Sequence, residues 1–88
     1  MTEQTANRSL DARGLYCPEP VYRTRLEIED MPVGHVLEVL ADDPAAEEDI
    51  KVWTSRAGQS LLGLEKNGYD FRFLIKKIVE NKPKVLSR

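Results

Sequence analysis

Residues 60–78 read "SLLGLEKNGYDFRFLIKKI", and this stretch decides the fold because it predicts a β-hairpin late in the chain. From Tyr69 to Ile75, apolar side chains alternate with mostly polar neighbours, which is the period of a half-buried strand. The Asn67-Gly68 pair separates this run from an apolar run before it, and such a pair between two strands is the strongest short hairpin signal. We therefore expect two antiparallel strands joined at Asn67-Gly68.

The segments before the hairpin predict two helices. "DDPAAEEDIKVWTSRAG", residues 42–58, carries start and stop signals together: Asp43 as N-cap, Pro44 at the first helical position and Gly58 at the end. An earlier helix is expected over residues 18–30, where apolar residues recur with helical spacing. The residues expected to face the core are Val21, Thr24, Ile28 and Met31 in the first helix and Ala46, Ile50, Trp53 and Ala57 in the second.

Two further strands complete the predicted fold. "SLDARG", residues 9–14, is a short strand followed by a turn, and "VLEVLA", residues 36–41, is an apolar run that we expect inside the sheet. The order of elements is then βαβαββ. Two helices on one face of a four-stranded mixed sheet would bury all the apolar stripes, so the predicted class is α+β, a two-layer α/β sandwich.

Length and composition predict one small domain. The chain has 88 residues, of which 41% are hydrophobic and 32% charged, a balance typical of a globular protein rather than a disordered one. We expect the domain over residues 10–78, with a flexible leader over 1–9 and a flexible tail over 79–88. The basic end "IKKIVENKPK", residues 75–84, is expected to guard an edge strand and to aid solubility.

Charge and cysteine content exclude several classes of function. A net charge of −2 offers no electrostatic basis for binding a phosphate backbone, so direct nucleic-acid binding is not expected. No segment has the apolar length of a signal peptide or a membrane span, which predicts a cytoplasmic protein without a membrane partner. One cysteine and one histidine form neither a disulfide framework nor a zinc site, so no metal or cofactor is expected.

The single cysteine lies in "GLYCPEPV", residues 14–21, between a glycine turn and two prolines. If the helix begins at Pro18, Cys17 is its N-cap, because a residue before proline favours the extended conformation that an N-cap needs. Pro20 has no N–H group, so the amides on either side of it are left to face the sulfur. We therefore expect an accessible thiol at the positive end of the helix.

Charges near the thiol act in both directions. A helix N-terminus favours the thiolate, the nucleophilic form of cysteine, and would also stabilise a persulfide anion. Glu19 opposes the anion, whereas Arg13, Arg23 and Arg25 favour it, and the sequence does not rank these effects. The alternative is a buried, purely structural Cys17, because free cysteines are among the most buried residues. The spacing alone leaves both interpretations open.

Three segments, in the right order, resemble a known family. "LDARGLYCPEPV" (residues 10–21), with its Cys-Pro-x-Pro core, resembles the opening of the TusA/SirA family of small sulfur-carrier proteins. "ADDPAAEEDIKVW" (41–53) and "YDFRFLIKK" (69–77) are similar to the family's second-helix and last-strand segments. The resemblance covers roughly residues 10–78 and again implies a two-layer α/β fold.

The resemblance also implies a function and partners. A cysteine desulfurase or a rhodanese would load sulfane sulfur as a persulfide, and a downstream relay protein would receive it for tRNA thiolation, cofactor supply or sulfur oxidation. Such a carrier is an enzyme only in the sense that a covalent intermediate cycles on it, and it works naturally as a monomer. By position, Cys17 bears the sulfur, Gly14, Pro18 and Pro20 frame it, and Glu19, Arg25 and Asp43 lie near a docking face.

Two other functions compete with the carrier. One is a non-catalytic, regulatory docking module in which Cys17 is only structural, and slow thiol chemistry would favour it. The other is a thiol redox protein, which is disfavoured because the chain lacks the second cysteine of a C-x-x-C pair.

Overall fold

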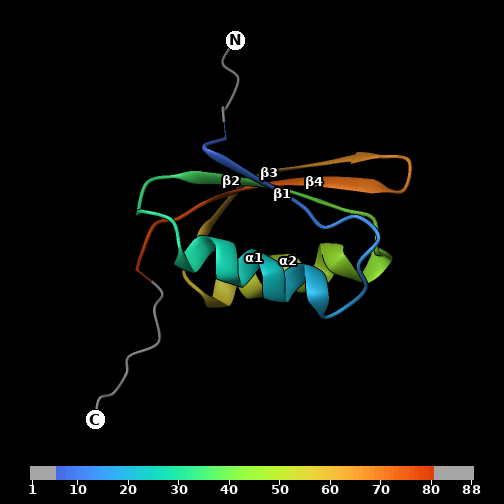
Figure 1. Ribbon diagram of the computed structural model, residues 1–88, viewed down its shortest axis with the longest axis horizontal. Coiled ribbons are helices and arrows are strands. Elements are labelled where there is room, and N and C mark those ends of the chain that lie inside the picture. The colour runs from blue at the N-terminus through green and yellow to red at the C-terminus, as the bar shows by residue number, and fades with distance from the viewer. Residues whose placement is uncertain (1–5, 81–88) are drawn as a thin grey trace.

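The computed structural model describes residues 6–80, and they form six elements in the predicted βαβαββ order. The elements are β1 (Arg8–Asp11), α1 (Glu19–Glu29), β2 (Val36–Ala41), α2 (Pro44–Arg56), β3 (Ser60–Asn67) and β4 (Asp70–Lys76). Figure 1 shows two layers, with both helices on one face of the sheet. The predicted α+β sandwich is therefore confirmed.

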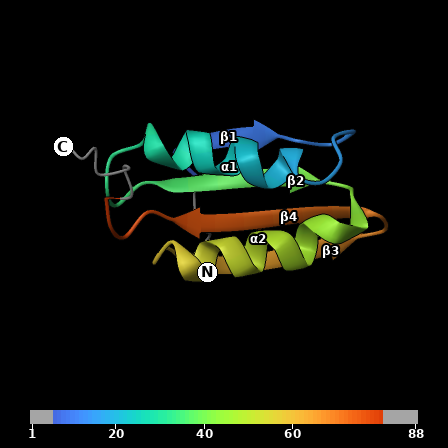
Figure 2. The same ribbon diagram turned by 90° about the horizontal axis from the view of Figure 1, so that it is seen from below.

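The four strands form one mixed sheet in the order β1-β2-β4-β3. β1 pairs with β2 in parallel, whereas β2 with β4, and β4 with β3, are antiparallel. β2 therefore lies inside the sheet, as its apolar run predicts, and β1 and β3 form the edges. Seen from the helical side in Figure 2, α1 lies over β1 and β2, and α2 lies over β4 and β3.

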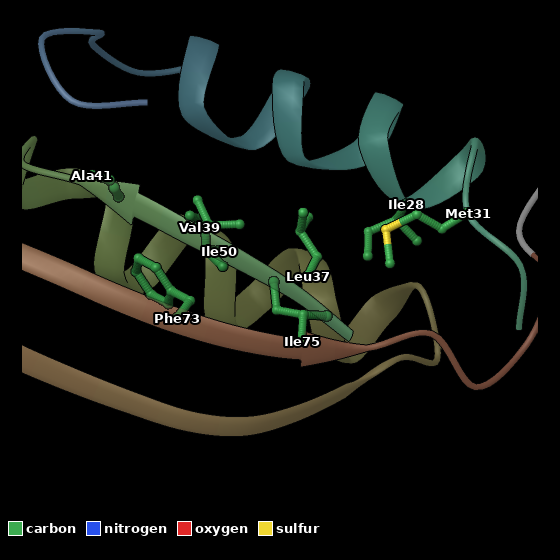
Figure 3. Packing of buried hydrophobic residues seen from close by; sticks show 9 residues of the cluster. Ile28, Met31, Leu37, Val39, Ala41, Ile50, Phe73 and Ile75 are labelled. Atoms are coloured by element: carbon green, nitrogen blue, oxygen red, sulfur yellow. The ribbon is translucent and has the colours of Figure 1, made fainter. Parts of the chain in front are cut away.

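The core lies between the two layers, where side chains of β2 and β4 meet those of the helices (Figure 3). Thr24 and Ile28 of α1 and Ala46 and Ile50 of α2 are buried, as their spacing predicts, whereas Val21 is half-buried. Burial of apolar surface of this kind supplies most of the stability of a small domain. The buried apolar cluster consists of Ile28, Met31, Leu37, Val39, Ala41, Ala46, Ile50, Phe73 and Ile75.

At the end of α2, the residue buried in the core is not one of those predicted. Trp53 and Ala57 are half-buried, and Thr54 is buried in their place. A threonine tolerates this position because its hydroxyl is satisfied, donating to the Ile50 carbonyl oxygen at 2.7 Å. Trp53 packs against the core cluster with one side and remains accessible on the other.

The C-terminal hairpin is confirmed, but its turn lies one residue later than expected. Asn67 pairs with Asp70, so Gly68 and Tyr69 form the two-residue turn. Gly68 has a φ of 69°, in the left-handed region that favours glycine. The Asn-Gly signal thus locates the hairpin correctly, and the glycine alone supplies the unusual backbone conformation.

The prediction of a solubilising basic end is wrong at Lys77. β4 is an interior strand, and the Lys77 side chain, just after it, is fully buried. Its Nζ donates to the Met31 carbonyl oxygen at 2.7 Å, just beyond α1, and to Glu80 Oε2 at 3.3 Å. Lys77 therefore ties the end of the chain's last strand to the end of the first helix.

Both predicted domain boundaries move. Arg8 and Ser9, assigned to the leader, belong to β1. Val79, assigned to the tail, donates its N–H to Gln59 Oε1 at 3.2 Å and accepts from Gln59 Nε2 at 3.0 Å. Residues 1–5 of the predicted leader and 81–88 of the predicted tail lie outside the described residues.

Candidate functional site

The candidate thiol lies in the loop between β1 and α1. Cys17 is exposed, which confirms the accessible position that its motif predicts. Gly14 opens the loop with a φ of 85°, and its N–H donates to Asp42 Oδ1 at 2.9 Å. Because residues with a side chain rarely adopt that φ, glycine is required there. The loop is thereby attached to the segment that joins β2 to α2.

The start of α1 differs from the prediction by one residue. Pro18 occupies the cap position, after a cis Cys17-Pro18 peptide bond, so Cys17 precedes the cap instead of forming it. Pro20 takes the second helical position, where a missing N–H leaves no intrahelical bond unmade. The Glu19 amide donates to the Tyr16 carbonyl oxygen at 2.8 Å and does not face the sulfur as expected.

Asp43 connects the cysteine loop to α2. It is the predicted N-cap, because its Oδ1 accepts from the Ala45 amide at 3.2 Å. Its Oδ2 accepts from the Cys17 amide at 2.7 Å, and the residue is only 8% exposed. The family resemblance places Asp43 near a docking face, and its burial and two hydrogen bonds show that it also positions Cys17.

Asp49 is the partner of the thiol itself. Cys17 Sγ donates a hydrogen bond to Asp49 Oδ2 at 3.0 Å. Asp49 lies in the second turn of α2 and is half-buried. Sequence reasoning missed this residue, because no local pattern links positions 32 residues apart. The contact exists only because α2 packs beside the loop that precedes α1.

The environment of Cys17 raises its pKa. The main cause is the hydrogen bond to Asp49, which holds the proton on sulfur, followed by partial desolvation and the negative charges of Asp49 and Asp43. The expected preference for the thiolate is therefore not met, because the carboxylates of Asp49 and Asp43 favour the protonated form of the thiol. At neutral pH the free protein carries a thiol at this position.

The arginines expected to offset these charges are engaged elsewhere. Arg13 pairs with Asp11 at 2.9 Å, and Arg23 pairs with Glu19 at 3.3 Å. Arg25 lies 3.8 Å from a carboxylate oxygen of the next helical turn. Among the described residues, no cation contributes to the pKa of Cys17.

An open groove lies beside the thiol, between α1 and α2. It has a volume of about 520 Å³, and a neighbouring groove of about 310 Å³ shares Pro18, Val21 and Trp53 with it. Asp49 lines the second groove, so a chain segment lying there would touch the partner of the sulfur. The first groove is lined by Pro18, Glu19, Val21, Tyr22, Arg25 and Trp53.

Two of the three predicted docking residues share this groove. Glu19 and Arg25 are both exposed, and the Arg25 guanidinium lies 5.6 Å from the centre of the Tyr22 ring. Tyr16, next to the cysteine, is 72% exposed. Tyrosine, tryptophan and arginine are the residues most enriched at the centres of protein interfaces, so the surface around the thiol has the composition of a binding site.

The described part of the chain contains neither a candidate metal site nor a candidate membrane-spanning helix. Within residues 6–80, no group of three or more His, Cys, Asp or Glu side chains has an arrangement that could hold a metal ion. In the same range, neither helix combines the length and the apolar character needed to cross a bilayer.

The comparison with known proteins identifies the family. The sequence model of a family described as "Sulfurtransferase TusA" matches residues 8–77. The chain belongs to this family. The resemblance of its three segments to TusA/SirA proteins is thereby confirmed, and the family supports a role as a sulfur carrier.

Relatives and a solved structure agree with this assignment. A protein of Archaeoglobus fulgidus named "Putative sulfur carrier protein" is 48% identical over 75 residues, 83% of this chain and 96% of that protein. The Bacillus subtilis "Putative sulfur carrier protein YrkF" is 37% identical over 68 residues, and the match spans 77% of this chain but only 37% of that longer protein. The crystal structure of a SirA-like protein from Desulfitobacterium hafniense has a TM-score of 0.72 at 25% identity, covering 82% of this chain and 99% of its own.

Proposed function

We propose that this TusA-family protein accepts sulfane sulfur as a persulfide on Cys17 and passes it to a downstream acceptor protein. The observation that supports it most is the exposed thiol at the start of α1, presented beside an open groove rich in interface residues. Gly14, Pro18 and Pro20 shape the loop that presents it. The chain has no second cysteine that could release the sulfur by forming an internal disulfide.

The transfer step needs only thiol chemistry. The Cys17 sulfur attacks the outer sulfur of a persulfide on the donor's cysteine; a new S–S bond forms at Cys17, and the donor's own S–S bond breaks. The donor cysteine leaves as a thiolate and takes up the proton that Cys17 gives up. Onward transfer repeats this exchange with an acceptor thiolate as attacker. Neither step consumes an oxidant or a reductant.

Membership of the family supports a proposal for the partners. The donor is a cysteine desulfurase or a rhodanese, and the acceptor is a relay protein in tRNA thiolation, cofactor supply or sulfur oxidation. Glu19 and Arg25 are the residues we propose to contact these partners, since both line the groove next to the thiol. The carrier acts in the cytoplasm as a monomer and makes no direct contact with nucleic acid.

Mass spectrometry of the intact protein tests the proposal. Incubation with a cysteine desulfurase and L-cysteine, or with a rhodanese and thiosulfate, should add one sulfur atom that dithiothreitol removes. The addition should be absent in Cys17→Ser. Arg25→Glu should weaken binding of the donor without changing the rate at which a small alkylating reagent modifies Cys17, because Arg25 does not contact the sulfur.

One observation favours the docking module as a second candidate. The raised pKa of Cys17 lowers the fraction of reactive thiolate in the free protein. The exposure of the sulfur and its place beside the groove favour the carrier. If neither donor system modifies the wild-type protein, the carrier is refuted and the docking module is the better account.

A further inference from the structure

Cys17 and Asp49 form a pair that the transfer chemistry does not require. The thiol proton lies between Sγ and a carboxylate oxygen 3.0 Å away, and α2 holds that carboxylate in place from a different part of the fold. A relay cysteine could be exposed to solvent without such a partner. The hydrogen bond from Cys17 to Asp49 therefore needs a separate explanation.

We infer that Asp49 restrains Cys17, keeping it in the protonated and unreactive form until a donor docks in the adjacent groove. This inference rests on the proposed function, because it assigns a regulating residue to the same sulfur. Asp49 contacts the reacting atom, and it also lines the groove in which a partner would lie. A docked partner can thus reach the restraining group and the sulfur together.

The surroundings of the thiol support a restraining role over an activating one. An activated cysteine has a cation or an open helix N-terminus beside it, which stabilises the thiolate. Here the charges that act on the sulfur are the carboxylates of Asp49 in α2 and of Asp43, the N-cap of α2, while Glu19 on α1 pairs with Arg23. The amide of Glu19, the first helical residue, donates to the Tyr16 carbonyl oxygen and is not available to a thiolate.

Restraint has a chemical benefit for a carrier that travels between partners. Thiolates, and not thiols, react with peroxide and with stray disulfides, so a protonated Cys17 resists oxidation while unloaded. The loading step remains balanced: the thiol gives its proton to the departing donor cysteine as the sulfur moves across. A cationic group of the donor placed against Asp49 would weaken the hold on that proton during docking.

Asp49→Asn separates the charge from the geometry. Asparagine keeps an acceptor oxygen for the thiol but removes the negative charge, so the pKa of Cys17 should fall. The pH profile for alkylation of Cys17 by iodoacetamide should shift to lower pH, with a rate near neutral pH about three- to tenfold above wild type. Asp49→Ala, which also removes the acceptor, should move the profile in the same direction.

Glu48→Gln is the matched control. Glu48 is the exposed neighbour on the same helix, and its replacement changes the net charge by the same amount without touching the thiol. Its profile should match the wild type. An unchanged profile in both Asp49 variants, or an equal shift in Glu48→Gln, overturns the inference. Circular dichroism melting curves identify any variant that has lost its fold.

Sulfur loading of the wild type, measured in parallel, distinguishes failure of this inference from failure of the proposed sulfur-carrier function. If the profile shifts but no donor loads the wild type, sulfur carriage fails and the restraint on the thiol remains. If the wild type loads normally and the profiles do not shift, Asp49 has no restraining role and the carrier stands.

Discussion

Replacing Asp43 by alanine should destabilise the protein and release the cysteine loop together. The side chain caps α2 through Ala45 and holds the Cys17 amide with its second oxygen. Loss of an N-cap costs about 1 kcal/mol, and loss of a hydrogen bond to a charged group costs roughly 1.5–3 kcal/mol. We expect Asp43→Ala to lower the free energy of unfolding by about 2.5–4 kcal/mol, which for a domain of this size lowers Tm by roughly 10–25 °C.

Asp43→Ser tests how this loss divides between the two contacts. Serine is a good N-cap but is too short to keep the second contact, so we expect a loss of about 1.5–3 kcal/mol. Urea and thermal unfolding followed by circular dichroism give both values. The reasoning is refuted if Asp43→Ala unfolds within about 0.5 kcal/mol of the wild type. If that stable variant also fails to bind the sulfur donor, Asp43 is a docking residue after all.

Three shorter predictions concern the rest of the fold. Gly14→Ala should cost about 1–2 kcal/mol in urea unfolding because of the left-handed backbone, whereas Gly63→Ala, with an ordinary φ and open space, should stay within about 0.5 kcal/mol; equal effects would contradict this. Lys77→Ala should cost about 2–4 kcal/mol, because it leaves a cavity and an unpaired carbonyl, and Lys77→Met should recover part of this loss; wild-type stability in the alanine variant would contradict it. Hydrogen bonds to Arg72 and Ser9 on the neighbouring strands lower the pKa of Glu38. The ionised carboxylate therefore stabilises the fold at neutral pH, and this stabilisation is lost as pH falls below the ordinary carboxyl range. Glu38→Gln should flatten the dependence of the free energy of unfolding on pH in that acidic range.

Local sequence signals predicted the elements that depend on local interactions. The alternation from Tyr69 to Ile75 and the glycine at the turn locate the hairpin, and the unbroken apolar run of residues 36–41 locates the interior strand. Asp43 and Pro44 mark the start of α2 at the right residue. These features are set by backbone conformation and by burial on one face, and the sequence shows both directly.

Contacts between distant segments were not predictable in this way. The burial of Lys77 could not be predicted, because lysine is rarely buried and only the packed fold reveals the carbonyl oxygen that its ammonium group contacts. The direction in which the pKa of Cys17 shifts could not be predicted, because Asp49 reaches the thiol from another helix, 32 residues along the chain. The predicted start of α1 differs from the structure by one residue, because Pro18 and not Cys17 is the cap.

The central claim, that Cys17 takes up sulfur and gives it away, is tested most directly by recovering the carried atom. The protein is loaded by a desulfurase from L-cysteine that is radiolabelled at sulfur, and the donor is then removed. Treatment with cyanide converts the sulfane sulfur to thiocyanate. We predict one equivalent of labelled thiocyanate from the wild type and none from Cys17→Ser. A wild-type protein that yields no labelled thiocyanate, or a Cys17→Ser protein that yields as much as the wild type, would contradict the account.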